Sequence, residues 1–207
     1  MNKAFKYRIY PNAEQREMFA KTFGCVRFIY NRMLSDKIAY YKETGKKLNN
    51  TPAQYKAEYE WLKEVDSLAL ANAQLNLQRA YNNFFRNHNV GFPKFKSKHK
   101  GSRSYTTNNQ KDTIRIEGKH IRLPKIGMVR IKVHRQIPPD HTIKSVTVSQ
   151  SPSGKYHVSI LCEFGHETSP IKPETFVGLD FSMSELFIDS EGNAPIIQSI
   201  IGRLRCI

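Results

Sequence analysis

Hydrophobic and polar residues alternate near the start of the chain and again in its second half, which is the period of half-buried β-strands. The first alternating run covers residues 5–10 and ends at Pro11. Turns rich in Gly, Pro and Ser separate the later runs. These later strands are predicted at 113–117, 120–123, 128–133, 143–150 and 156–163. The pattern is typical of a β-barrel or a β-sandwich.

Between these two regions, apolar residues recur at the three- and four-residue spacing of amphipathic helices. Asn12 is a predicted N-cap, and Gly24 is expected to separate two short helices in the manner of a helix-turn-helix. A long helix is expected to follow a cap at Asp66 and Ser67. The predicted helices cover residues 13–22, 25–42, 51–61 and 68–87.

The pattern changes again after Ser169 to Pro173, which is the predicted linker. A strand at 176–181 is expected to pair with residues 185–188, and a turn is expected at 189–192. The predicted fold class is therefore α+β. Its predicted parts are a first strand (1–12), a helical segment (13–90), further strands (91–168), a linker (169–175) and a last domain (176–207).

Charge divides the 207-residue chain unevenly. The formal net charge is +15, from 33 Lys and Arg residues against 18 Asp and Glu. Residues 1–150 hold 29 of the basic and 11 of the acidic residues, whereas residues 151–207 have a net charge of −3. The densest stretch, 86–135, has 14 basic residues against only Asp112 and Glu117. Such a concentration indicates a polyanionic partner.

Aromatic residues lie among these charges, which favours a nucleic acid over a face that is basic only for solubility. Cations hold phosphates, and rings stack on bases. A membrane surface is the weaker partner, because the run has no amphipathic helical period. The residues concerned are Phe92, Phe95 and Tyr105, among Lys94, Lys96, Lys98, Lys100 and Arg103.

Several other classes of protein receive no support from the sequence. No apolar run is long enough for a transmembrane helix, and the first residues do not resemble a secretory signal. The three cysteines, Cys25, Cys162 and Cys206, form no C-x-x-C pair, so neither a zinc site nor a disulfide framework is expected. The histidines lack metal-binding spacing, and no phosphate loop is present. We expect a cytoplasmic protein.

Asp180 ends an apolar strand, where a carboxylate is costly unless it binds a metal, accepts hydrogen bonds or faces water. One interpretation is a ligand for a catalytic divalent ion. The other is an ordinary aspartate close to a turn. Spacing alone favours the second interpretation, since isolated carboxylates rarely mark metal sites.

Four segments, in order along the chain, resemble the TnpB (OrfB) family of bacterial insertion sequences. Residues 178–181, Gly-Leu-Asp-Phe, together with Ser190-Glu191-Gly192 are similar to the first RuvC motif of that family. The other three are residues 7–12 (the opening strand), residues 22–31 (the helix-turn-helix segment) and residues 91–96 (Gly-Phe-Pro-Lys-Phe-Lys).

The resemblance implies a Mg²⁺-dependent, RNA-guided DNA endonuclease. It implies a wedge-type barrel with an inserted helical recognition domain, followed by the first strands of a RuvC domain of ribonuclease H-like fold. The implied partners are a guide RNA encoded by the element and double-stranded target DNA, in a prokaryotic, nucleoid-associated setting. The resemblance makes Asp180 the catalytic residue and metal ligand. The nucleic-acid-binding candidates are Arg27, Lys94, Lys96, Lys98, Lys100, Arg103, Tyr105, Thr107 and Asn108.

The end of the chain departs from the family. Residues 196–207 do not resemble it, and the further acidic motifs and the zinc ribbon of its RuvC domain are missing. One nucleotide inserted after the Pro195 codon could restore Asn-Tyr-Pro-Lys-Tyr-Tyr-Arg-Lys-Ala-Glu-Met, which resembles the usual continuation. A frameshifted, truncated and inactive nuclease without zinc is therefore expected. The alternative is a nuclease-dead regulator that binds RNA and DNA; a basic structural RNA-binding protein is a third interpretation.

Overall fold

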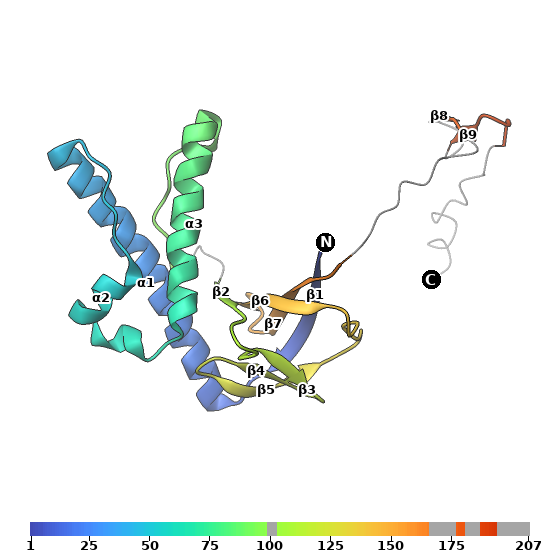
Figure 1. Cartoon of the computed structure of the whole chain (residues 1–207), viewed down its shortest axis with the longest axis horizontal. Coiled ribbons are helices and arrows are strands. Elements are labelled where there is room, and N and C mark those ends of the chain that lie inside the picture. Colours follow the sequence, from blue (N-terminus) through green and yellow to red (C-terminus); the bar gives the residue numbers. More distant parts are fainter. Residues whose placement is uncertain (99–102, 166–176, 181–186, 194–207) are drawn as a thin grey trace, which may run out of the picture. The chain divides into compact units, whose positions relative to one another are not determined.

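The computed structural model describes residues 1–98, 103–165, 177–180 and 187–193, apart from the side chain of His88. The chain divides into two compact units, Met1–His166 and Glu167–Ile207. The first unit contains a curled sheet and a group of helices, and the second contains a short strand pair (Figure 1). The fold class is α+β, as the sequence predicts.

Seven antiparallel strands form the sheet of the first unit, in the order β2-β6-β7-β1-β5-β4-β3. The first strand along the chain, β1, therefore lies in the middle, between β7 and β5. Its partners all come from the second half of the unit. The strands are β1 (Asn2–Tyr10), β2 (Arg103–Asn108), β3 (Arg115–Glu117), β4 (His120–Leu123), β5 (Gly127–Lys132), β6 (Thr142–Gln150) and β7 (Tyr156–Glu163).

The two-residue period of β1 sets the two faces of the sheet. Phe5, Tyr7 and Ile9 are buried, whereas the residues between them are exposed. In the register with β7, Phe5 lies opposite Ile160, which is also buried. The buried side chains of both strands therefore face the same core.

The helices lie in the chain between β1 and β2: α1 (Ala13–Thr44), α2 (Pro52–Glu58) and α3 (Ser67–Arg86), with short 3₁₀ helices at Glu60–Lys63 and His88–Val90. Asn12 caps α1, since its Oδ1 accepts from the Gln15 backbone N–H at 2.8 Å. Asp66 caps α3 by accepting from the Leu68 N–H at 3.2 Å. The long helix predicted at 68–87 is confirmed.

The expected break at Gly24 is wrong, because α1 is continuous through this position. One glycine inside a helix costs about 1 kcal/mol relative to alanine. A buried face on both sides of Gly24 outweighs that cost, since it packs the helix along its length. This face consists of Phe19, Thr22, Phe23, Cys25, Val26, Ile29, Tyr30, Met33 and Leu34.

Aromatic rings join the start of α1 to the sheet. The Phe19 ring lies 5.5 Å from that of Tyr156 on β7 and 6.4 Å from that of Tyr105 on β2. The Phe23 ring lies 5.8 Å from that of Tyr105. The Thr107 hydroxyl adds a polar link, because it donates to the carboxylate of Asp66 at the start of α3.

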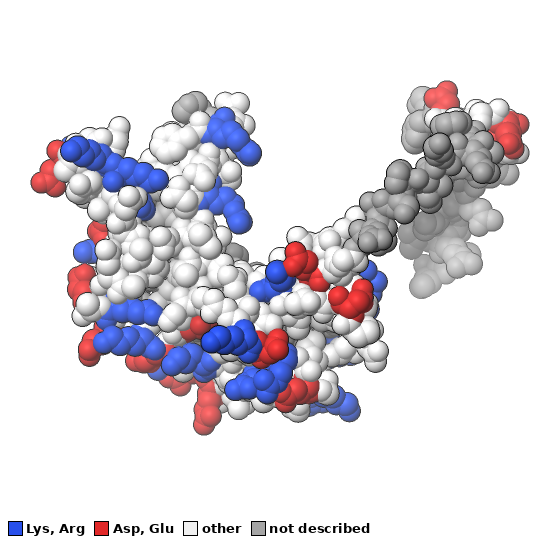
Figure 2. All heavy atoms as spheres, viewed as in Figure 1, with Lys and Arg blue, Asp and Glu red and all other residues white. Residues whose placement is uncertain are grey.

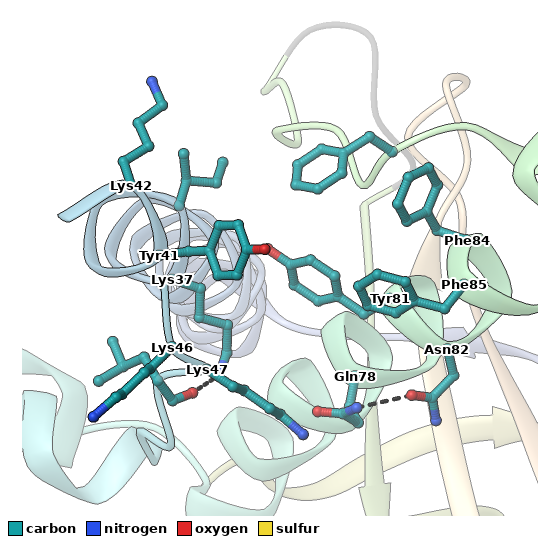
Figure 3. Close-up of a pocket in the computed structure, with 13 residues that line it drawn as sticks. Lys37, Tyr41, Lys42, Lys46, Lys47, Gln78, Tyr81, Asn82, Phe84 and Phe85 are labelled. Carbon is teal, nitrogen blue, oxygen red and sulfur yellow. Dashed lines mark hydrogen bonds between the residues drawn. The ribbon is translucent and has the colours of Figure 1, made fainter. Parts of the chain in front are cut away.

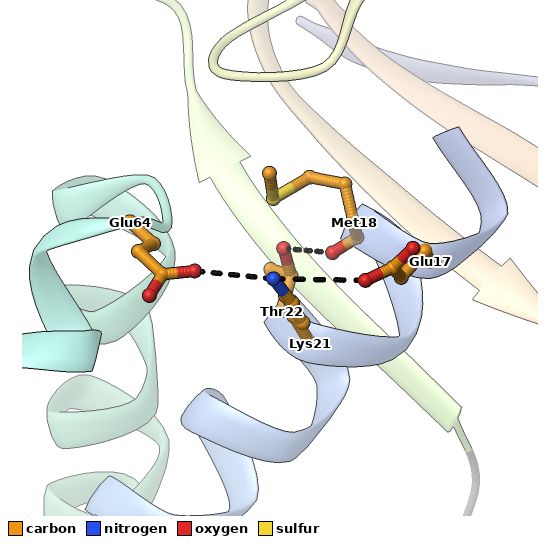
Figure 4. A network of polar contacts seen from close by, with 5 residues as sticks. All are labelled: Glu17, Met18, Lys21, Thr22 and Glu64. Atoms are coloured by element: carbon orange, nitrogen blue, oxygen red, sulfur yellow. Dashed lines mark hydrogen bonds and ion pairs between the residues drawn. The ribbon is translucent and has the colours of Figure 1, made fainter. Parts of the chain in front are cut away.

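A small polar network joins α1 to the segment that leads into α3 (Figure 4). Lys21 Nζ lies 3.3 Å from a carboxylate oxygen of Glu64 and 3.7 Å from one of Glu17. The Thr22 hydroxyl donates to the Met18 carbonyl at 2.8 Å. Because Lys21 and both glutamates are exposed, the ion pairs contribute little stability. Their effect is to orient the connection.

Most of the predicted strands are confirmed, but the strand at 103–108 was not predicted. Its sequence, Arg-Ser-Tyr-Thr-Thr-Asn, has polar residues on both faces, and Thr107 is buried as a hydrogen-bonded threonine. The expected barrel is an open curled sheet among the described strands, with β2 and β3 at its two ends.

In the second unit, β8 (Leu179–Asp180) pairs with β9 (Ile188–Asp189) in antiparallel fashion. The expected hairpin is thus confirmed within the described residues. The predicted linker and the tail after Pro195 lie outside them. None of the helices in the described part of the chain is long and apolar enough to cross a membrane.

We expect Gly24→Ala to stabilise the protein by about 1 kcal/mol, because a helical glycine loses more backbone entropy on folding than alanine does. A Cβ atom at this position would meet no other atom within 4 Å. Urea unfolding measures the change. A decrease in stability would contradict the continuous helix and favour a turn at residue 24.

We expect Thr107→Val to destabilise the protein by about 1.5 to 3 kcal/mol, because it removes a hydrogen bond to a charged carboxylate while keeping the side-chain volume. Thr142→Val is the matched control, since Thr142 is an exposed strand threonine. Equal unfolding midpoints for the two variants would show that the Thr107–Asp66 contact does not link β2 to α3.

Candidate nucleic-acid interface

The exposed face of the central strands carries a row of basic side chains. Arg8 on β1 lies opposite Lys132 on β5, and on the other side it lies opposite His157 on β7. Tyr10 lies opposite Arg130, which in turn lies opposite His120 on β4. We call this surface the basic sheet face; its members are Lys6, Arg8, Tyr10, Arg122, Arg130 and Lys132, all exposed.

Tyr10 is the aromatic centre of the basic sheet face. The residue is 42% exposed, and the guanidinium carbons of Arg8 and Arg130 lie 5.0 and 5.8 Å from the centroid of its ring. Cation–π contacts at such distances hold the three side chains together. Tyr10 also lines a depression with a volume of about 480 Å³. The other lining residues are Gly118, Lys119, Arg130, Ile131, Lys132 and Val133.

The charges on this face act on a neighbouring histidine. The pKa of His157 is lowered, first by burial and then by the nearby positive charges of Lys6, Arg8 and Lys155. Among the residues that the structure describes, no acidic one lines the depression beside Tyr10. A surface with these properties attracts phosphates.

Sequence reasoning missed the basic sheet face, although a signal was present. Residues 5–10 alternate, so the positions that are not apolar face outward together, and Lys6 and Arg8 occupy two of them. The same holds for Arg130 and Lys132 in β5. Only the strand order shows that these two pairs are neighbours.

The predicted loop residues lie between α1 and α3, and Asn31 fixes their backbone. Asn31 Oδ1 accepts from the Lys96 N–H at 2.8 Å, and Asn31 Nδ2 donates to the Lys96 carbonyl at 2.9 Å. Lys96 Nζ lies 4.3 Å from the centroid of the Tyr30 ring, and burial there lowers the pKa of Lys96. Asn31 is therefore a positioning residue that the sequence did not reveal.

The same loop is anchored on α3 through Phe92. The Phe92 ring meets those of Tyr81 and Phe84 edge-on, at centroid distances of 5.6 and 5.5 Å. Pro93 is buried, whereas Lys94, Phe95 and Lys98 are exposed. The Gly-Phe-Pro-Lys-Phe segment thus connects the two long helices and presents lysines to solvent.

The predicted residues on β2 divide into surface and core. Arg103 is exposed, and one guanidinium nitrogen donates to Gln150 Oε1 at 3.0 Å. Tyr105 is 4% exposed and Thr107 is fully buried, so we place both in the core rather than at a surface that contacts a nucleic acid. The Tyr105 ring packs against the rings of Phe19 and Phe23. The Thr107 hydroxyl donates a hydrogen bond to the Asp66 carboxylate.

Asn108 remains near the surface where β2 meets α3. It is half-buried, and its Oδ1 lies 3.5 Å from Asn72 Nδ2. Arg27 is half-buried on α1. Lys100 lies outside the described residues. The predicted candidates are thus divided between the loop at 91–98 and the strand at 103–108, and their role in binding stays a prediction.

In the second unit, Asp180 is exposed and lies opposite Ile188 in the strand pair. Asp189 accepts from the backbone of Glu191 and from both the backbone and the side chain of Asn193, and these hydrogen bonds lower its pKa. The Asp189 carboxylate at the end of β9 therefore holds the turn that follows the strand. Among the described residues, no three His, Cys, Asp or Glu side chains gather as a metal site. A two-magnesium centre needs several carboxylates, so the role of Asp180 as a metal ligand stays a prediction.

Comparison with known proteins gives matches along most of the chain. The model of the OrfB/IS605 helix-turn-helix domain matches residues 1–46, which here form β1 and the continuous helix α1. InsQ of Escherichia coli (strain K12), named as a candidate RNA-guided DNA endonuclease, is 32% identical over 197 residues, which is 91% of this chain and 47% of InsQ.

A similarly named protein of Streptomyces pristinaespiralis is 32% identical over 199 residues, covering 93% of this chain and 49% of the relative. The virulence protein VsdF of Salmonella dublin is 37% identical over 116 residues, which is 48% of this chain and 96% of VsdF. The chain thus spans about half the length of the two endonuclease-named relatives.

A solved structure described as a Cas12f1-sgRNA-target DNA complex aligns with 92% of this chain and 54% of its own, at 11% identity and a TM-score of 0.41. We draw no argument from a likeness at that level. The two endonuclease-named relatives carry the assignment, because their matches cover 91% and 93% of this chain, and the OrfB/IS605 domain model agrees with them over residues 1–46. The chain belongs to the TnpB (OrfB) family.

Proposed function

We propose that the first unit is the nucleic-acid-binding part of a TnpB-type RNA-guided DNA endonuclease, and that it binds a guide RNA and double-stranded target DNA. The names of two relatives support the class of activity. The basic sheet face is the observation that carries the proposal for this chain. It combines exposed cations with an exposed ring, which is the combination used for phosphates and bases.

The finer assignments of domains belong to the same proposal. The helices from α1 to α3 are the recognition segment inserted into a wedge-type sheet, since they lie in the chain between β1 and β2. The strand pair β8–β9 is the start of a RuvC domain. The guide RNA is encoded by the same element. Arg103, which is exposed, and Asn108, which is half-buried, contact the target from the two ends of β2.

Binding without cleavage is the proposed role of the 207-residue chain. Asp180 is the first ligand for Mg²⁺ in this proposal, and among the described residues no group of three His, Cys, Asp or Glu side chains gathers as a metal site. The expected frameshift after Pro195 falls outside the described residues. Sequencing the DNA downstream of the gene tests it, because a decayed gene would retain the Glu and Asp motifs in another frame.

The basic sheet face can be tested by combining Arg8→Gln, Arg130→Gln and Lys132→Gln. We expect weaker binding of duplex DNA and structured RNA, because each lost phosphate contact on a duplex flattens the slope of log K against log salt by about 0.9. The slope should therefore fall by about 2 to 3. Fluorescence anisotropy over a salt series measures it.

The matched control combines Lys21→Gln, Lys63→Gln and Lys144→Gln, which removes the same number of positive charges. These three lysines lie in exposed ion pairs with carboxylates. Its salt slope should stay close to that of the parent chain. Equal slopes for the two triple variants, at equal thermal stability, would reject the basic sheet face as the contact surface.

The Asp180 assignment is tested with guide RNA, guide-matched duplex DNA and Mg²⁺. The chain should bind the duplex without cutting it, because one carboxylate cannot position two Mg²⁺ ions. Asp180→Ala should leave the affinity for DNA unchanged. Cleavage by the parent chain that disappears in Asp180→Ala would contradict this proposal and would make Asp180 a catalytic residue.

A further inference from the structure

A cleft lies between the C-terminal parts of α1 and α3, outside the basic sheet face. The two helices diverge toward these ends (Figure 1), and the space between them has a volume of about 550 Å³. That volume is within the range of small-ligand sites, roughly 300 to 1,000 Å³. Aromatic residues from both helices and from the 91–98 loop line it, among them Tyr41, Tyr81, Phe85 and Phe92 (Figure 3).

The rings in this cleft leave open faces. Tyr41 is 64% exposed and Phe85 is 67% exposed, although both are large. Tyr81 supports Phe85 from one side, since their rings are stacked at a centroid distance of 6.2 Å and an interplanar angle of 17°. Phe92 supports Tyr81 edge-on. A concave, mostly apolar surface with a few polar groups at its edge is the usual form of a ligand-binding site.

Lysines surround the rings. Lys37, Lys42, Lys46 and Lys47 all line the cleft, and no acidic residue is among its lining residues. Lys37 Nζ donates to the Leu48 carbonyl at 2.6 Å, and burial together with the charge of Lys47 lowers the pKa of Lys37. The other three lysines are exposed. Figure 2 shows basic side chains at the ends of both helices.

We propose that this cleft binds unpaired nucleotides of a single strand. The bases stack on Tyr41 and Phe85, and the backbone phosphates contact Lys42, Lys46 and Lys47. Stacking on exposed rings is independent of base identity, since every base has a π-face. The proposal rests on the proposed function, and it adds a second site with a different chemistry.

The charge of the lysines and the exposure of the rings favour an unpaired strand over a duplex or a second copy of the chain. A duplex hides its base faces in the stack, so it could use the lysines but not the rings. A second copy of the chain would bring its own lysines against these, which like-charge repulsion disfavours. An unpaired strand supplies both the anions that the lysines need and the flat apolar faces that the rings need.

The test compares three fluorescent probes on the purified chain by anisotropy: an oligouridylate, the matching oligodeoxyuridylate, and an abasic strand with the same number of phosphates. The parent chain should bind both base-bearing strands more tightly than the abasic one. Combining Tyr41→Ala with Phe85→Ala should weaken oligonucleotide binding by about thirtyfold or more, because two stacked bases are lost, and should remove the advantage over the abasic strand.

A charge variant separates stacking from electrostatics. Combining Lys42→Gln, Lys46→Gln and Lys47→Gln should flatten the salt slope by about 2, because each contact on a single strand contributes about 0.7. The aromatic variant should keep the parent slope. Tyr40→Ala is the matched control, since Tyr40 is on the same helix and is not among the lining residues of the cleft.

The outcomes distinguish the two proposals. If the aromatic variant binds both base-bearing strands like the parent, the cleft proposal is wrong and the proposed function stands. If the aromatic variant changes only the oligomeric state in sedimentation, the occupant is a second copy and the proposal is overturned. If the parent chain binds no nucleic acid at all, both proposals fail. A difference between the two base-bearing strands identifies RNA or DNA as the source.

Discussion

The pairing of β1 with both β5 and β7 is the constraint on which the rest of the described unit depends. This strand is the first element of the chain, yet it lies in the middle of the seven-stranded sheet. Both strands that pair with it come from residues beyond 126. The chain must therefore leave the sheet after β1, form the helices, and return to the sheet. The same pairing decides where α1 starts and therefore which of its faces is buried.

The register of β1 determines both which residues fill the core and which residues form the basic sheet face. Phe5, Tyr7 and Ile9 fill the core, and Arg8 and Tyr10 consequently face solvent beside the cations of β5. A slip of one residue would reverse the two faces and would bury Arg8. The core therefore fixes the basic sheet face, although the residues of that face contribute little to the core. The cleft between α1 and α3 depends on the loop at 91–98. Asn31 and Phe92 hold this loop against the two helices.

Sequence patterns predicted elements with strong periodicity and failed where polar residues are buried. The strands at 120–123 and 156–163 and the helix after Asp66 follow from spacing alone. Gly24 misled the prediction, because the packing of a buried helix face outweighs the cost of one glycine. The basic stretch at 86–135 is the densest in charge, yet Tyr105 and Thr107 within it are core residues. Composition shows how many charges a segment holds; only strand order and burial show which of them share a surface.

The most direct test of the central claim is photo-crosslinking of the chain to a 4-thiouridine-substituted RNA hairpin, with the crosslinked peptides mapped by mass spectrometry. Our account predicts crosslinks in β1 at Tyr10 and in the neighbouring strand β5. Prior addition of unlabelled hairpin should remove them. Crosslinks confined to other surfaces, such as the exposed side of α1 around Glu17 and Lys21, would contradict the account.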